Sequence, residues 1–350
     1  MATWAKNEIV LPDGRRVSAQ TPIIVSASRS TDIPAFYADW FMERLKAGYV
    51  KWYNPFNGVP LYVSFNKARL FVFWSKNPAK MLETRPDANE SPIDVLEREG
   101  RNYYFQFTMN DYDAERIEPN VPPLESRIKT FVALSKRISH HARERIVWRF
   151  DPLILTDALT PKILLDRIRR IGDRIAPYAA RLVFSFIDIK AYAKVAKNLE
   201  RGGIAAREFA HEEMLEVAEG IATMTGEWNM VAGTCGELAD LPGVEHNRCI
   251  DDRLMVKCFS HDAELMKFIG AKRHSGDPLF GTEDTWACDA YKKDAGQRAA
   301  CGCVMSKDIG EYDTCPHLCH YCYANTGNAV ALANWRRHLD CPCAETITGR

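Results

Sequence analysis

Short runs of apolar, β-branched and aromatic residues recur along the chain, and segments with helical periodicity separate them. Near-continuous apolar character is typical of strands that are covered on both faces, as in a parallel sheet. The pattern therefore predicts six buried strands, with a seventh around Gly302 to Ser306. The six lie at residues 23–28, 70–74, 103–108, 146–150, 182–187 and 230–234.

Helices are expected between these strands. Pro34 can begin a helix that runs to Gly48, with Asp32 near its N-cap. Thr160 and Pro161 are the residue types of an N-cap and a first helical position. Three further helical segments lie at residues 124–138, 212–224 and 326–338.

Alternating strands and helices imply an α/β fold with a parallel sheet, and their number suits a (β/α) barrel or partial barrel of the TIM type. An open doubly wound sheet is the alternative, but no G-x-G-x-x-G sequence follows any expected strand. We expect a single domain over residues 1–350. Residues 49–65 predict a hairpin or an active-site loop, and residues 272–281 predict a surface loop.

Polar residues stand where each expected strand ends, for example Ser28 to Asp32 after the first strand. In a barrel these ends lie on one face, where active sites are built, although loops at a surface are polar in any case. Arg149 is the sharper signal, because it lies within an apolar run and a buried arginine needs an anionic partner. Asp151 could be that partner in a structural ion pair, and a ligand carboxylate is the alternative.

The most informative motif is C-x3-C-x2-C, formed by Cys315, Cys319 and Cys322 after the last expected strand. Three thiolates on one short loop can hold three corners of a cubane iron–sulfur cluster, which normally takes four cysteines. One iron would then keep an open position, where a substrate or cofactor can bind, as at catalytic zinc. We therefore expect residues 301–343 to be a cluster-binding segment.

This motif resembles the signature of the radical S-adenosylmethionine superfamily, in which an aromatic residue usually precedes the last cysteine, as Tyr321 does here. The resemblance implies a 4Fe–4S cluster that binds S-adenosylmethionine through its fourth iron and cleaves it reductively. It also implies a full or partial (β/α) barrel, an electron donor such as flavodoxin or ferredoxin, and a substrate that the motif does not identify. The motif also leaves open which carbon–sulfur bond breaks: one gives a 5′-deoxyadenosyl radical, another transfers the aminocarboxypropyl group.

Members of the superfamily usually carry the motif after the first strand, whereas here it follows the last. First and last strands are neighbours in a closed barrel, so a permuted order keeps the same site. The loop that contains Arg29 and Asp32 would then lie where the superfamily binds the methionine amino group. The candidate cofactor-binding residues are Arg29, Asp32, Arg149, Asp151 and Tyr321, and the catalytic residues stay unassigned.

A second resemblance covers nearly the whole chain. It is to an uncharacterised bacterial family, described as a domain of unknown function with a C-terminal, radical-SAM-like cysteine cluster. This resemblance supports the cluster and the fold but implies no substrate. The segments that carry it are residues 26–34, 73–78, 105–108, 148–152, 185–188, 301–303 and 308–310.

Zinc is the main alternative metal, with His317 or His320 as a fourth ligand. The protein would then be a zinc- or cluster-stabilised scaffold or a redox sensor instead of an enzyme. Two C-x-C pairs flank the motif and together could hold an auxiliary cluster or a zinc ion; they are Cys301, Cys303, Cys341 and Cys343. Cys249 and Cys258 are expected to be buried small residues.

Composition narrows the function classes. The chain has 46 basic and 46 acidic residues, and this net charge of zero argues against a nucleic-acid partner, which calls for a basic surface. No signal-like N-terminus and no apolar run of about 20 residues is present, so we expect a cytoplasmic protein without a membrane partner. Eleven cysteines in such a protein indicate metal, redox or catalytic roles.

Overall fold

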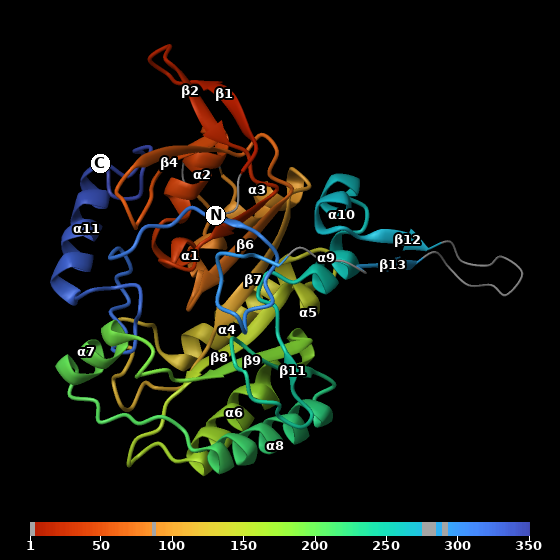
Figure 1. Cartoon of the computed structure of the whole chain (residues 1–350), viewed down its shortest axis with the longest axis vertical. Helices are drawn as coiled ribbons and strands as arrows, with labels where there is room; N and C mark the ends of the chain where they lie inside the picture. Colours follow the sequence, from red (N-terminus) through yellow and green to blue (C-terminus); the bar gives the residue numbers. More distant parts are fainter. Residues whose placement is uncertain (1–3, 86–88, 275–284, 289–292) are drawn as a thin grey trace, which may run out of the picture.

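The computed structural model describes residues 4–85, 89–274, 285–288 and 293–350. Its centre is an eight-stranded sheet in the order β11-β10-β9-β8-β7-β6-β3-β14, in which every neighbouring pair is parallel (Figure 1). The chain is thus a mixed α/β protein. The strands are β3 (Ile24–Ala27), β6 (Leu70–Ser75), β7 (Asn102–Thr108), β8 (Ile146–Leu153), β9 (Arg181–Phe186), β10 (Val231–Thr234), β11 (Glu245–His246) and β14 (Lys307–Asp308).

The six predicted strands are confirmed, but the predicted position of the seventh is wrong. Instead of Gly302 to Ser306, the strand is β14, and Val304 forms an isolated antiparallel bridge with Lys293. β14 pairs with β3, so the last strand does lie beside the first, as the permuted order requires. β11 and β14 are the two edges of the sheet, and no pairing joins them within the described residues.

The predicted helices are present with shifted ends. The helix expected from Pro34 to Gly48 is two helices, because Tyr37 leaves helical geometry between them and its buried hydroxyl donates to Thr314 O at 2.5 Å. Thr160 caps α6 as predicted, since its side chain accepts from Ile163 N. The helices are α1 (Ile33–Phe36), α2 (Ala38–Ala47), α3 (Pro92–Arg98), α4 (Leu124–Arg137), α5 (Ala142–Arg145), α6 (Pro161–Ile175), α7 (Ala193–Arg201), α8 (His211–Glu227), α9 (Asp252–Phe259), α10 (Ala263–Ile269) and α11 (Asn328–Asp340). None of the helices in the described part of the chain combines the length and apolarity that a membrane span requires.

Two smaller sheets flank the large one. β1 (Lys6–Val10), β2 (Arg16–Gln20), β5 (Pro60–Ser64) and β4 (Tyr49–Tyr53) form a four-stranded sheet, in which β4 and β5 are the predicted hairpin. β12 (Lys272–His274) pairs with β13 (Thr285–Ala287). The loop predicted at residues 272–281 is therefore wrong for residues 272–274, and residues 275–281 lie outside the described residues.

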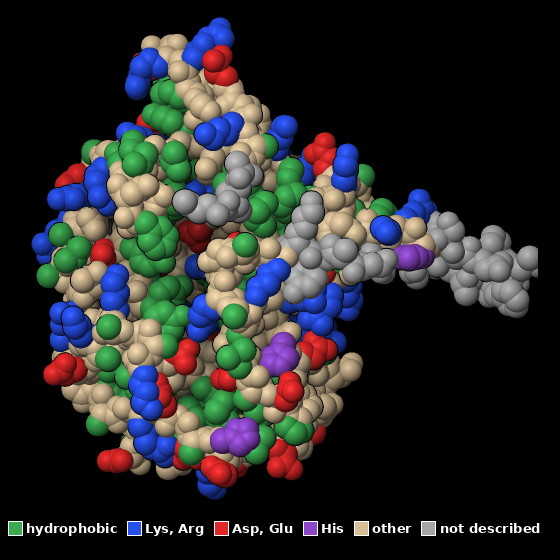
Figure 2. All heavy atoms as spheres, viewed as in Figure 1, with side chains coloured by type: hydrophobic (Ala, Val, Ile, Leu, Met, Phe, Trp, Pro, Cys, Tyr) green, Lys and Arg blue, Asp and Glu red, His purple; other side chains and the backbone are tan. Residues whose placement is uncertain are grey.

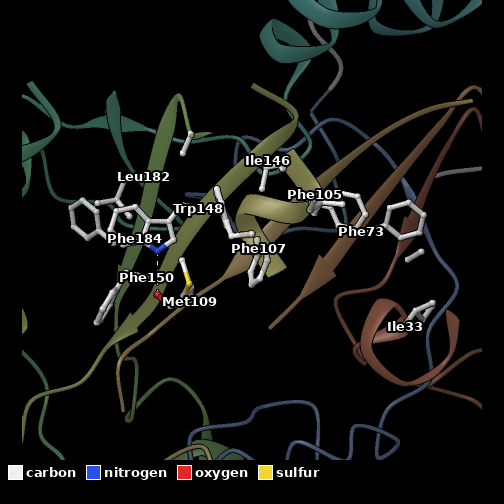
Figure 3. Close-up of a cluster of buried hydrophobic side chains, with 14 of the residues drawn as sticks. Ile33, Phe73, Phe105, Phe107, Met109, Ile146, Trp148, Phe150, Leu182 and Phe184 are labelled. Carbon is white, nitrogen blue, oxygen red and sulfur yellow. Dashed lines mark hydrogen bonds between the residues drawn. The ribbon is translucent and has the colours of Figure 1, made fainter. Parts of the chain in front are cut away.

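Both faces of the large sheet are buried, which explains the near-continuous apolar runs. On one face, side chains such as Phe73, Phe105 and Trp148 form the main core with the flanking helices (Figure 3). On the other face, side chains that include Val72 and Tyr104 pack with α9 and α10. Successive side chains of a strand point to opposite faces, so each strand contributes to both cores.

Candidate active site

The three motif cysteines lie in the loop between β14 and α11, beside the loop that follows β3. Cys319 is buried, and Cys315 and Cys322 are half-buried. Burial raises the pKa of all three thiols, and their charges interact with one another. The backbone N–H groups of Asp32 and His317 lower the Cys315 pKa and so partly oppose the effect of burial, and Asn325 N donates to Cys322 Sγ at 3.4 Å. The loop thus offers N–H donors to sulfurs, an arrangement that favours thiolates.

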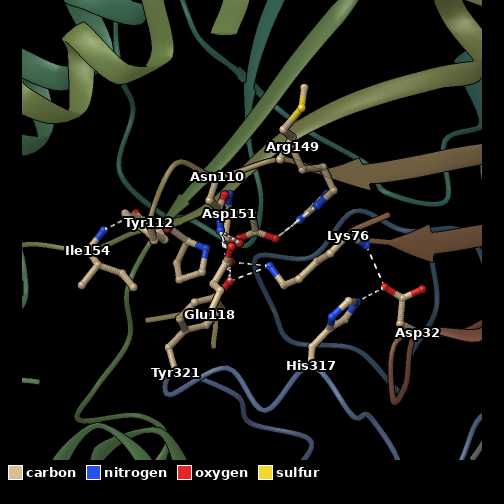
Figure 4. A network of polar contacts seen from close by, with 12 residues as sticks. Asp32, Lys76, Asn110, Tyr112, Glu118, Arg149, Asp151, Ile154, His317 and Tyr321 are labelled. Carbon is tan, nitrogen blue, oxygen red and sulfur yellow. Dashed lines mark hydrogen bonds and ion pairs between the residues drawn. The ribbon is translucent and has the colours of Figure 1, made fainter. Parts of the chain in front are cut away.

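Asp32 connects three segments at this edge of the sheet. Its Oδ2 accepts from His317 Nε2 at 2.9 Å and from Lys76 N at 2.7 Å, while its Oδ1 accepts from Ala35 N at 3.0 Å (Figure 4). The carboxylate is therefore engaged by the cysteine loop, the end of β6 and the first turn of α1. His317 Nδ1 also lies 3.3 Å from Asn120 O, so both ring nitrogens have hydrogen-bond partners.

A buried ion pair lies next to the cysteines. Lys76 Nζ contacts Glu118 Oε1 at 2.7 Å and Tyr321 OH at 2.6 Å, and Tyr321 also donates to Glu118 (Figure 4). Burial alone would raise the pKa of Glu118, but Lys76 and Arg127 hold it at about 2. Burial would lower the pKa of Lys76, and Glu118 more than offsets this effect, so the Lys76 pKa is raised. Both groups are therefore charged at neutral pH.

Asn110 connects this pair to Arg149 and Asp151. Asn110 Nδ2 donates to Tyr321 OH at 3.0 Å, and Asn110 Oδ1 accepts from Asp151 N at 2.8 Å. Arg149 Nη2 lies 2.5 Å from Asp151 Oδ2, and Ser185 donates to the other carboxylate oxygen. Of the two partners expected for Arg149, the structure contains the ion pair with Asp151.

Arg29, in the loop after β3, has a separate set of contacts. Its guanidinium lies over the Trp74 ring, 5.0 Å from the centroid, and its backbone N donates to Asp308 Oδ2 at 2.8 Å. Arg29 Nη2 is shielded from solvent and has no hydrogen-bond partner among the described residues. Thr31 Oγ1 and Asn77 Oδ1 are likewise shielded from solvent and have no hydrogen-bond partner among the described residues. A buried polar atom without a partner is costly, so these atoms are available to a ligand.

The structure thus brings Asp32, Tyr321, Arg149 and Asp151 into one network with residues that the sequence did not single out. Two of those, Lys76 and Asn110, lie in strand-end segments and could have been selected on that signal. Glu118 carries no such signal, because it lies in the long connection between β7 and α4.

The two C-x-C pairs are not brought together. Cys303 is buried and accepts from Ile250 N at 3.4 Å, whereas Cys341 and Cys343 are exposed beyond α11, where Arg44 donates to Cys343 O. Within the described ranges, no three His, Cys, Asp or Glu side chains already surround one point as ligands of a single metal ion.

The face shown in Figure 2 is hollowed near its middle. Hydrophobic side chains gather around this hollow, and an acidic side chain is visible within it. Lys, Arg, Asp and Glu side chains are spread over the rest of the face, without a continuous basic patch.

The chain matches a protein-family model. The family model described as "Domain of unknown function (DUF1848)" matches residues 24–324, which include all eight strands of the large sheet and the three motif cysteines. No curated protein and no solved structure matches the chain.

Proposed function

The chain belongs to the family described as a domain of unknown function (DUF1848), and we propose that it is a radical S-adenosylmethionine enzyme. One observation carries the proposal: β14 pairs in parallel with β3, with Lys307 opposite Val25. Because of this pairing, the cysteine loop after β14 and the polar loop after β3 leave the sheet side by side at its carboxyl edge. Ligand sites of parallel α/β sheets lie at that edge.

In this proposal Cys315, Cys319 and Cys322 hold a 4Fe–4S cluster. The cluster, when bound, supplies the electron that cleaves the sulfonium of S-adenosylmethionine. The N–H donors at Cys315 and Cys322 fit such a site, because hydrogen bonds to the sulfurs stabilise thiolate ligands.

The buried atoms without a hydrogen-bond partner are the groups that would bind the cofactor. Thr31 and Asn77 present buried oxygens that can accept from an ammonium group, and they follow β3 and β6 at the same edge. Asp32, whose oxygens already accept three hydrogen bonds, would act as a positioning residue that orients His317 and the cysteine loop. Tyr321 and the Lys76–Glu118 pair would form the wall behind the cluster and exclude water from it.

We further propose that the eight parallel strands form a partial barrel, open between β11 and β14. The substrate would lie on the inner face, near the network that includes Asn110 and Asp151. This arrangement would shield a radical reaction from solvent.

The experiment is anaerobic reconstitution with iron and sulfide, followed by dithionite and S-adenosylmethionine. We expect a brown protein with about four irons on the motif cysteines that forms 5′-deoxyadenosine or transfers the aminocarboxypropyl group. The C315A/C319A/C322A variant should do neither, while C258A, which removes a buried cysteine of α9, should match the wild type. A colourless, zinc-loaded protein that leaves the cofactor intact would reject the proposal in favour of a scaffold.

A further inference from the structure

Four cysteines outside the motif converge on the face of the sheet that packs with α9 and α10. Cys235 follows β10, Cys249 follows β11, and Cys301 and Cys303 precede β14. The Cys235 and Cys249 sulfurs are 3.3 Å apart, Cys303 Sγ accepts from the backbone N of Ile250, which follows Cys249, and the charges of Cys249, Cys301 and Cys303 interact with one another. The segments around Cys249 and Cys303, which are 54 positions apart in sequence, are therefore neighbours in space. The sequence predicts only that Cys249 is a buried small residue, because nothing in its spacing indicates these partners.

From this convergence we propose a second metal site, in which Cys235, Cys249, Cys301 and Cys303 bind one thiophilic metal centre as four thiolates. Four cysteines are the full ligand set of a structural zinc site or of a closed 4Fe–4S cluster. The site is distinct from the motif cysteines and keeps no open position. In this structure the four sulfurs do not surround one point, so metal binding requires their side chains to turn toward a common centre.

The surroundings of these cysteines match the charge of such a centre. A divalent ion with four thiolates carries a net charge of minus two, and two arginines face the sulfurs. Arg149 Nη1 lies 3.1 Å from Cys249 Sγ, and Arg149 is almost fully buried. The Arg29 guanidinium, with its unpartnered Nη2, is close enough to Cys303 and Cys249 for their charges to interact. The buried Arg29 Nη2 lacks a hydrogen-bond acceptor among the described residues, and an anionic metal–thiolate centre would provide one.

Hydrogen-bond donors to sulfur are already in place. Ile250 N donates to Cys303 Sγ at 3.4 Å, and Asn247 Nδ2 lies 3.7 Å from Cys249 Sγ. Such second-shell donors orient metal-bound thiolates and stabilise their charge. A surface hollow of about 220 Å³, lined in part by Cys301 and Gly302, gives a metal an entry path.

The position of the site also gives it a role. Cys249 lies three residues beyond β11, and Cys303 lies four residues before β14, so the centre would join the segments next to the two edges of the sheet. These segments already touch, since Val304 N donates to Ile250 O at 3.0 Å. A metal there would link the two edges of the sheet, β11 and β14. Because the motif cysteines follow β14, the metal would also help to fix their position.

The test uses the C315A/C319A/C322A variant, so that metal at the motif does not contribute and the outcome is independent of the proposed function. Folded protein from cells supplied with both metals is desalted, and zinc and iron per chain are measured by mass spectrometry. We expect about one zinc, or about four irons, per chain, and at least a tenfold loss when C249A and C303A are added. Either metal supports the site, and their ratio identifies the occupant. A background variant that binds neither metal, or that keeps its metal without Cys249 and Cys303, would overturn it.

A second measurement covers the case in which the added substitutions impair folding. Cysteine alkylation of the intact background variant is mapped with and without added zinc under reducing conditions. Zinc should protect Cys235 and Cys301 at least fivefold, while the exposed Cys341 and Cys343 react equally in both samples. Equal alkylation of all four would reject the proposal. Removal of both exposed cysteines, C341A/C343A, should leave the metal content unchanged.

Discussion

His317 Nε2 and Asp32 Oδ2 lie 2.9 Å apart, and both side chains are almost completely buried. One residue belongs to the cysteine loop after β14 and the other to the loop after β3, so this contact joins the loops that follow two neighbouring strands of the sheet. Asp32 keeps its bonds from Lys76 N and Ala35 N when His317 is absent. The contact can therefore be removed without uncapping α1.

We expect His317→Ala to loosen the cysteine loop more than the fold. The substitution removes one buried hydrogen bond to Asp32 Oδ2, which costs about 1–3 kcal/mol of unfolding free energy. The iron retained after anaerobic reconstitution should fall several-fold, measured as iron and sulfide per chain. His320→Gln, in the same loop, is the control and should keep the wild-type iron content. Equal iron in both variants would show that the His317–Asp32 contact does not hold the loop.

The Lys76–Glu118 pair predicts a specific loss of stability in acid. The pKa of Glu118 is about 2 in the folded protein, against an ordinary value of 4.5. A depressed carboxyl pKa stabilises the fold above the ordinary value, and this contribution disappears as the pH falls from about 4.5 to about 2. By pH 3 the wild type should have lost about 2 kcal/mol of unfolding free energy through this group.

Urea unfolding at several pH values between 6 and 3 tests this prediction. Glu118→Gln should be less stable at pH 6, because Lys76 loses its partner, but its stability should fall less between pH 5 and pH 3. Glu216→Gln, at an exposed position of α8, should keep the pH dependence of the wild type. Parallel curves for the wild type and Glu118→Gln would contradict the assigned charge state.

The Arg149–Asp151 pair shows how far sequence reasoning reached. Arg149 stands out in the sequence because it lies within an apolar run, and Asp151 is the acidic residue expected to pair with it, as it does in the structure. The six strands of the sheet were predictable for the same reason: burial on both faces leaves a local signal. The contacts of Glu118 and the Cys235–Cys249 contact have no such local signal in the sequence. They depend on which segments the fold brings together. The two-residue strands β11 and β14 could not be predicted either, because a strand this short shows no alternation of apolar and polar residues.

Asp151→Asn should strongly destabilise the protein. The substitution leaves the Arg149 guanidinium buried without a counter-charge, which typically costs about 3–5 kcal/mol. Asp166→Asn is the matched control, because it removes the exposed Lys162–Asp166 pair, whose loss should cost less than about 1 kcal/mol. Urea unfolding at pH 7 measures both. A loss below about 1 kcal/mol for Asp151→Asn would mean that another group neutralises Arg149.

Gly310 tests whether close packing between β14 and β3 positions the site. A Cβ at Gly310 would stand 1.9 Å from Ser28 Oγ and 2.6 Å from Ser28 Cβ, so Gly310→Ala must push the two segments apart. Ser28 Oγ and Gly310 N both donate to Asp308 Oδ1, at 2.8 Å and 2.9 Å, so the shift would also disturb the Asp308 contacts that join β14 to the loop after β3.

We expect Gly310→Ala to lower the unfolding free energy by about 1–3 kcal/mol, as overpacking of a filled site does, and to reduce the iron held by the motif cysteines. Gly226→Ala in α8 is the matched control, because a Cβ there meets nothing within 4 Å. Since alanine favours helices over glycine, that variant should be unchanged or more stable by up to about 1 kcal/mol. Urea unfolding and iron content are measured for both. If Gly310→Ala keeps full iron while losing stability, the cysteine loop does not depend on the β3–β14 pairing for its position.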